Sequence, residues 1–196
     1  MTTYLFIDGE NFLHKLEDAL IQQDIAKNTI DSAHLDLKKL IQLALPKEQI
    51  AKSTFYSAKL QLYPATHAKS LKLIQQQRIL KANLEKQGFT FILAGNVRSQ
   101  TVTVNGKSKT IFREKGVDVR MAVDLVSLSC DKAIQRAIVC SSDSDLQPAI
   151  AETRKRGVEV IYLGFENSPN KGLTYTTNRT VLFRNSEVAE VVPILS

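Results

Sequence analysis

The sequence contains few of the residues that build disulfides, zinc sites or membrane spans. Its two cysteines, Cys130 and Cys140, each lie within an apolar segment without a second thiol nearby. We therefore expect both thiols to be buried and reduced, with neither a disulfide nor a zinc site. No apolar run approaches the length of a membrane span, and no basic stretch precedes the first predicted strand as it would in a signal peptide. These absences predict a cytoplasmic protein that does not bind membranes.

Several enzyme classes are excluded because their motifs are incomplete. The three histidines have no partner at metal spacing, so we expect them to be solvated or locally hydrogen-bonded. Gly106-Lys107-Ser108 resembles the end of a phosphate-binding loop, but the first glycine of that motif is absent and the triplet lies in a predicted hairpin. No G-x-G-x-x-G follows the first strand. The serines after the fourth strand lack a histidine partner and a nucleophile elbow, which excludes serine hydrolase chemistry.

Length and charge describe one basic domain. With 196 residues and 43% hydrophobic content, the chain is long enough for one buried core and short for two. We expect a single domain over residues 1–196, with a core at about 4–163, an insertion at 97–113 and a C-terminal extension at 164–196. The formal charge is +6 and the sequence pI is about 9.3. Such a surface suits a polyanion such as nucleic acid, although mild basicity is also common among globular proteins.

Strands and helices alternate along the chain. Residues 4–7 are apolar throughout, as in a central parallel strand that is buried on both faces. Further strands are expected at 53–57, 89–94, 137–141 and 158–163, and helices at 12–22, 35–44, 65–87 and 146–156. Because such crossovers are right-handed, helices will cover both faces of the sheet. The fold class is α/β: a three-layer α/β/α sandwich with a mainly parallel sheet, an inserted β-hairpin and a short edge strand at 181–183.

The inserted hairpin is basic. Residues 101–104 and 107–112 flank Asn105-Gly106, a strong signal for a two-residue hairpin turn. We expect this arm to lie beside the acidic site described below and to contact nucleic acid. The candidate contacts are Lys107, Lys109, Arg113 and Lys115 of the arm and Arg120 of the helix that follows. A solvated sheet edge whose lysines discourage aggregation is the alternative.

Aspartates follow several of the predicted strands. Asp8 ends the first strand, Asp143 and Asp145 follow the fourth, and Asp118 lies at the start of a helix. Because the carboxyl ends of parallel strands lie along one edge of a sheet, we expect these carboxylates to converge. Crowded carboxylates repel each other unless a cation lies among them. A hard divalent cation with oxygen ligands, Mg²⁺ or Mn²⁺, therefore fits the predicted site.

Each aspartate also has a structural interpretation, since Asp favours turns and helix N-caps. The joint placement of all these aspartates at the strand ends of one sheet is better explained by a metal site. Asp124 is different, because six positions beyond Asp118 is about 240° around a helix. We expect a structural role for Asp124, such as capping a neighbouring backbone, with a supporting role in the site as the alternative.

Three motifs together resemble the NYN domains, the LabA-like group of PIN-like nucleases. They are Phe6-Ile7-Asp8-Gly9-Glu10-Asn11, Lys115-Gly116-Val117-Asp118-Val119 with Ala122-Val123-Asp124, and Ser141-Ser142-Asp143-Ser144-Asp145-Leu146-Gln147-Pro148. They occur in the family's order, and the resemblance covers about residues 4–163. It implies a PIN-like, Rossmann-like sheet and metal-dependent cleavage of RNA. Ser142 stands where the family often has Gly.

The resemblance implies a site made of Asp8, Asn11, Asp118, Asp143 and Asp145. The four aspartates would hold one or two Mg²⁺ or Mn²⁺ ions, which polarise the scissile phosphate and acidify a water molecule. Asn11 would orient that water or a phosphate oxygen, with Asp124 and Ser142 in supporting positions.

Two other functions stay open at this stage. One is an RNA-binding protein that keeps the fold without cutting. The other is a Mg²⁺-dependent phosphohydrolase, although Asp8-Gly9-Glu10 does not supply the D-x-D-x-T nucleophile usual for that class. The sequence leaves open whether the substrate is single-stranded or structured RNA, whether DNA is also cut, and whether the protein is a homodimer.

Overall fold

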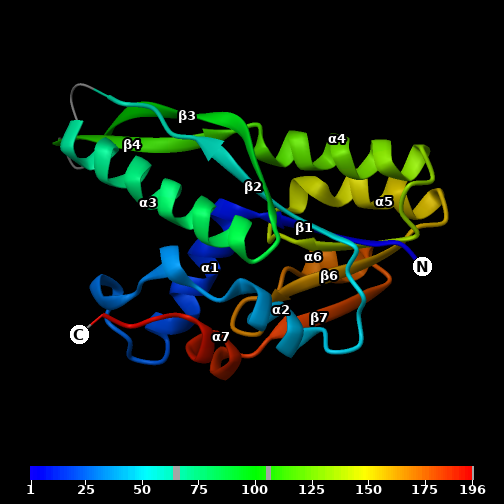
Figure 1. Ribbon diagram of the computed structural model, residues 1–196. Coiled ribbons are helices and arrows are strands. Elements are labelled where there is room, and N and C mark those ends of the chain that lie inside the picture. The colour runs from blue at the N-terminus through cyan, green and yellow to red at the C-terminus, as the bar shows by residue number, and fades with distance from the viewer. Residues whose placement is uncertain (64–66, 105–106, 196) are drawn as a thin grey trace.

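One sheet organises the molecule, as a computed structural model shows (Figure 1). The structure describes residues 1–63, 67–104 and 107–195, with side chains for all of these except 98–104 and 107–114. Within these residues, seven strands pair in the order β4-β3-β2-β1-β5-β6-β7. The strands are β1 Thr3–Asp8, β2 Lys52–Lys59, β3 Thr90–Val104, β4 Lys107–Lys115, β5 Arg136–Cys140, β6 Glu159–Phe165 and β7 Arg179–Phe183. Six are parallel and β4 is antiparallel, so the predicted α/β architecture is confirmed.

Helices cover both faces of the sheet (Figure 1). The α-helices are α1 Gly9–Ile21, α2 Leu37–Ala44, α3 His67–Lys86, α4 Val117–Cys130, α5 Gln147–Lys155, α6 Lys171–Thr176 and α7 Asn185–Val191. Short 3-10 helices are η1 Lys27–Thr29, η2 Ser32–His34 and η4 Ser144–Leu146. Side chains of α1, α2, α3 and α7 share one hydrophobic cluster, and those of α4, α5 and α6 share another on the opposite face.

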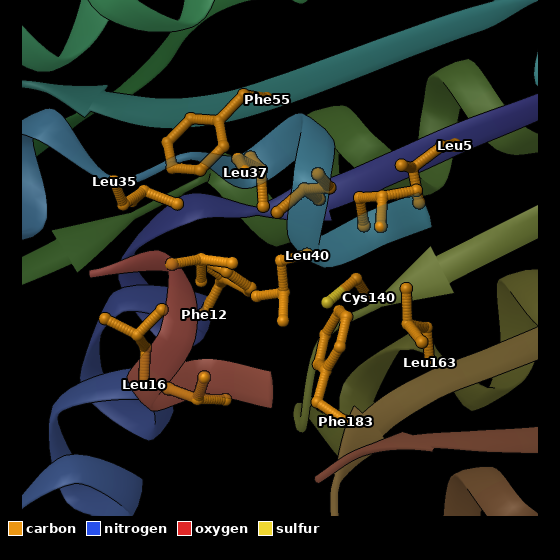
Figure 2. Packing of buried hydrophobic residues seen from close by; sticks show 14 of the residues in the cluster. Leu5, Phe12, Leu16, Leu35, Leu37, Leu40, Phe55, Cys140, Leu163 and Phe183 are labelled. Atoms are coloured by element: carbon orange, nitrogen blue, oxygen red, sulfur yellow. The ribbon is translucent and has the colours of Figure 1, made fainter. Parts of the chain in front are cut away.

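Alternate side chains of β1 belong to the two hydrophobic clusters. Leu5 and Ile7 belong to the first cluster and Phe6 to the second, because successive strand side chains point to opposite faces. Figure 2 shows the first cluster, in which Phe12 of α1 lies beside Phe55 of β2. Their rings meet edge to face at a centroid distance of 6.4 Å, an arrangement that aromatic quadrupoles favour. Since Phe12 is four residues beyond Asp8, this packing fixes the start of α1 at the carboxyl edge of the sheet.

The predicted hairpin is continuous with the third strand. That strand was expected to end at residue 94, but β3 runs on to Val104 and pairs with β4. Val104 pairs with Lys107, which agrees with a two-residue connection, while the Asn105-Gly106 turn lies outside the described residues. The strand carries a register shift against β2 near Ser57 and Lys59, and Gly95 has a positive φ of 69°. The apolar run therefore ends at an irregularity of the sheet near Gly95, and the strand continues beyond it.

The expectation for Cys130 was wrong, whereas Cys140 is buried as predicted. The buried face of α4 repeats every four residues and ends at Ser129. Cys130 is one residue further, about 100° around the helix, and so lies toward solvent. There its Sγ accepts a hydrogen bond from Arg156 Nε at 3.0 Å.

Other expectations for individual residues hold. His14 lies 3.1 Å from Asp18, and His34 lies 2.7 Å from Asp31, so both are locally paired.

Across the described ranges, no helix is both long and apolar enough to cross a membrane. The predicted edge strand at 181–183 lies within β7, which runs parallel to β6. Its Phe183 is fully buried and completes the first cluster.

Candidate active site

The register of β1 against β5 brings the first acidic residue to the β5 loop. Ile7 pairs with Cys140, so Asp8 and Ser141 leave their strands side by side. Ser141 Oγ donates to Asp8 Oδ2 at 3.1 Å and accepts from the backbone N–H of Asp143 at 3.1 Å. A single buried hydroxyl therefore connects two of the predicted metal ligands.

The turn from β1 into α1 holds Asp8 in place. Asp8 is the N-cap of α1, and its Oδ1 accepts from the Asn11 backbone N–H at 3.2 Å. A Cβ at Gly9 would lie 2.3 Å from Phe55 Cε1 and 2.6 Å from the Tyr56 carbonyl oxygen. Because no side chain fits there, glycine is required for α1 to start this close to β2.

Asp8 is an unusually shielded carboxyl group. Only 6% of the residue is exposed. Burial raises its pKa from 3.8 to about 6, and the charges of Asp143 and Glu10 add to the effect, whereas the hydrogen bonds from Asn11 and Ser141 oppose it. A nearby cation would reverse the shift, since it favours the ionised form.

Three further carboxylates form a compact group. Asp118, Asp143 and Asp145 each offer an oxygen, and these oxygens lie within 4.8 Å of one another. Asp118 is the second residue of α4, which Val117 anchors in the core. Asp143 caps η4 by accepting from the Asp145 backbone N–H at 2.9 Å. Carboxylate oxygens at such spacing fit the donor set of a hard divalent cation.

Asp8 is not in this compact group but opens onto the same cavity. The cavity has a volume of about 430 Å³ and is lined by Asp8, Glu10, Asn11, His14, Lys15, Gly116, Asp118, Ser142 and Asp143. Asp145 is exposed and does not line this cavity; with Asp118 it lines a neighbouring one. The structure thus brings the sequence-predicted aspartates to one edge of the sheet, as the parallel topology requires.

Asn11 is fixed by the loop after β5. Its Oδ1 accepts from the Ser142 backbone N–H at 2.9 Å and from Ser142 Oγ at 2.6 Å. With the oxygen occupied, the amide N–H groups are the ones available to donate into the cavity. The Ser142 carbonyl in turn accepts from Asn170 Nδ2 at 2.8 Å, so the C-terminal extension supports the loop.

Three residues of the site were missed in the sequence. Ser141 was considered only as a nucleophile, and its contact with Asp8 depends on the register of β1 against β5, which no local pattern shows. Lys15 lines the cavity, and its i+4 spacing from Asn11 on α1 was the available signal. Asn170 follows an irregular segment, and no local pattern indicates its contact with the loop.

Asp124 does not join the carboxylate group. It accepts from Tyr56 Oη at 3.0 Å and from Arg120 Nε at 2.9 Å. The contacts are with side chains, not with a neighbouring backbone as expected. Burial and the Asp124 charge raise the pKa of Tyr56 above its usual range, which keeps the hydroxyl protonated as a donor.

The predicted nucleic-acid contacts are described only in part. Lys115 and Arg120 are exposed. The side chains of Lys107, Lys109 and Arg113 lie outside the described part of the molecule, although their backbones belong to β4.

Comparisons with known proteins agree with this architecture. A family model described as NYN domain matches residues 2–182, which extends beyond the expected core into β7. The crystal structure of a protein of unknown function from Vibrio parahaemolyticus RIMD 2210633 is similar, with a TM-score of 0.59 and 16% identity over 92% of this chain and 91% of that chain. This likeness shows the fold. No curated protein matches.

Proposed function

We propose, on the premise that this chain belongs to the NYN domain family of PIN-like nucleases, that it is a metal-dependent endoribonuclease of the LabA-like group. The observation that carries the proposal is the group formed by Asp118, Asp143 and Asp145, whose oxygens lie within 4.8 Å of one another beside the buried Asp8. A protein that only binds RNA would lose affinity through carboxylates that face the phosphates, since like charges repel.

The compact carboxylate group would hold Mg²⁺ or Mn²⁺, with Asp8 facing the same cavity. Such an ion would supply Lewis-acid chemistry, which polarises a phosphate oxygen and lowers the pKa of a water molecule. Burial raises the pKa of Asp8 to about 6, and a bound cation would favour its ionised form. In-line attack of water on phosphorus would break the P–O3′ bond, with the water proton passing to solvent and the leaving 3′ oxygen taking up a proton, to give a 5′-phosphate and a 3′-hydroxyl.

Two residues of α1 would position the substrate. The Asn11 amide, with its oxygen held by Ser142, donates toward a phosphate oxygen. Lys15 lines the same cavity and provides a cation for a neighbouring phosphate. Both act from a helix that Asp8 and Gly9 fix against the sheet, so their geometry is set before substrate binds.

The central test is the Asp143→Asn variant. We expect it to lose cleavage of single-stranded RNA while its RNA affinity stays equal or increases, because the change removes a charge that the metal needs and that phosphates repel. Labelled RNA and DNA would be incubated with Mg²⁺ or Mn²⁺ and then with EDTA, and binding would be measured separately by anisotropy.

The matched control is Asp131→Asn, at the exposed C-terminal cap of α4 far along the helix from Asp118. This variant should cleave like the parent. Parental cleavage by Asp143→Asn, or activity that survives EDTA, would contradict the metal site. Absence of cleavage of every RNA and DNA tested, with Asp143→Asn altering affinity alone, would instead support a non-catalytic RNA-binding protein.

A further inference from the structure

A second cavity adjoins the carboxylate site. It has a volume of about 360 Å³ and is lined by residues of α1, α3 and the end of β2. Glu10 and His14 of α1 line both this cavity and the one that contains Asp8. A nucleic-acid strand with a phosphate at the carboxylates would therefore have a neighbouring base within reach of the second cavity.

The lining of the second cavity suits a flat aromatic ring. Leu13 of α1, Leu60 after β2, and Leu73 and Leu80 of α3 contribute apolar surface. A pocket with apolar walls and a few polar groups is typical of sites for small ring systems. Proteins that read single-stranded RNA by sequence take unstacked bases into such pockets.

The charges of this cavity disfavour a phosphate. Lys27 Nζ lies 2.8 Å from Glu17 Oε2, so these two charges neutralise each other. The Glu10 carboxylate has no hydrogen bond or ion pair with any of the described residues. Glu10 is exposed but lies in the hollow between the two cavities, where surrounding protein raises its pKa and the nearby His14 lowers it. The carboxylate is a hydrogen-bond acceptor without a donor among the described residues, so it suits a ligand with N–H donors.

Three amide side chains are among the polar groups that line this cavity. Gln61 and Gln76 line the cavity and each can donate or accept, although Gln61 Nε2 already donates to Asn96 Oδ1 at 3.4 Å. Gln77 is already committed, because its Nε2 donates to Ser57 Oγ at 2.9 Å and to the Ala58 carbonyl at 2.8 Å. These bonds hold α3 against β2 on the side of the cavity that Ser57, Ala58 and Gln77 line.

We propose that this cavity receives an unpaired guanine of the RNA strand that occupies the carboxylate site, with Glu10 accepting from the guanine N1–H and N2–H groups. Guanine alone among the four bases presents two adjacent N–H donors on its Watson–Crick edge, which match one carboxylate. Adenine and cytosine place a ring-nitrogen acceptor beside their amino group, and uracil flanks one N–H with two carbonyl acceptors. The inference rests on the proposed function only in that RNA is the polymer bound.

Binding measurements on the Asp143→Asn variant test this inference without requiring cleavage. The probes are fluorescent oligouridylates in which a single guanine is moved along the strand, together with matched strands that carry inosine or an abasic nucleotide at that position. We expect guanine at one position to tighten binding about tenfold over uracil, as a good bidentate base contact does. Inosine lacks the 2-amino group and should lose most of that gain, and the abasic strand all of it.

Two variants made in the Asp143→Asn background locate the effect. Glu10→Gln removes the acceptor and Leu73→Trp fills the cavity without changing charge, so each should erase the guanine advantage. Glu85→Gln is the matched control, because Glu85 lies on the same helix as Leu73, outside the cavity and near Lys81 at 3.8 Å. It should keep the advantage. Melting temperatures would show that each variant is folded.

The outcomes separate this inference from the proposed nuclease. A guanine preference that depends on Glu10, in a protein that cleaves no RNA, would support the base pocket and contradict the proposed nuclease activity. Metal-dependent cleavage with equal affinity for all the oligonucleotides would overturn the guanine pocket alone. Tight binding of free guanosine 5′-monophosphate without any guanine advantage in the strand would also overturn it, since the cavity would then be a mononucleotide site. Undetectable RNA binding would overturn both.

Discussion

At the scale of single residues, the acidic side chains of the site differ in environment. Asp8 is buried and accepts a hydrogen bond from Ser141, whereas Asp145 is exposed. Solvent screens an exposed carboxylate, while a buried one depends on its neighbours for compensation. The protonation of Asp8 therefore depends more strongly on its neighbours in the site than that of the exposed Asp145 does.

The raised pKa of Asp8 predicts a pH dependence of stability in EDTA. The folded state binds the Asp8 proton more tightly than the unfolded state, with a pKa of about 6 against 3.8. The stability that this group contributes is thus fully present below pH 3.8 and is lost as the pH rises through 6. Relative to Asp8→Asn, the free energy of unfolding of the parent should fall by about 3 kcal/mol across this window.

Urea unfolding at a series of pH values measures this difference. The Asp131→Asn variant should follow the parent, because its carboxylate is exposed. Parallel pH profiles for the parent and Asp8→Asn would mean that Asp8 is not perturbed in the folded protein.

At the scale of elements, the β3–β4 hairpin extends the sheet beyond the carboxylate site (Figure 1). Its antiparallel edge is rich in Lys and Arg. Such an edge either contacts phosphates or only protects the sheet from aggregation. The two roles differ in their dependence on salt.

Replacing Lys107, Lys109 and Arg113 by Ser should weaken RNA binding and flatten its salt dependence, without affecting the chemical step. Three lost phosphate contacts would reduce the slope of log affinity against log salt by about 2, at about 0.7 for each contact to a single strand. Titrations at several salt concentrations measure the slope, and single-turnover cleavage at saturating protein checks the chemical step. An unchanged slope would leave the hairpin as a protected edge and direct attention to the basic residues of α3.

At the scale of the whole molecule, the site joins segments from most of the chain. Asp8 ends β1, Asp118 lies on α4, Asp143 follows β5, and Asn170 of the extension donates to the loop after β5. A ligand that bridges these segments stabilises the native state by mass action, since the unfolded chain does not assemble the site.

Divalent cations should therefore raise the melting temperature of the parent but not of an Asp118→Asn, Asp143→Asn double variant. The gain is about 2.7 kcal/mol when the ion is present at a hundred times its Kd. Without metal, the double variant should be at least as stable as the parent, because carboxylate repulsion is reduced. Thermal melts in EDTA and in millimolar Mg²⁺ or Mn²⁺ measure both effects, and equal metal responses would remove the metal site.

The sequence by itself determined the layers and the edge at which the carboxylates meet. Apolar strands, helix stops and the Asn105-Gly106 signal are local patterns, and such patterns can be recognised without knowledge of distant contacts. Parallel topology then places the ends of β1 and β5 together, whatever the details of packing. Hence the convergence of Asp8, Asp118 and Asp143 on one cavity could be predicted from their positions along the chain.

Only the tertiary structure decided how these groups are partnered. The contact between Ser141 and Asp8 depends on the register of two strands that are far apart in sequence. The exposure of Cys130 depends on the rotation of α4 about its axis. The cavity beside Glu10 exists because α3 packs near α1. Registers, rotations and cavities are set by the packing of side chains from distant segments, and that information is not present in any single stretch of sequence.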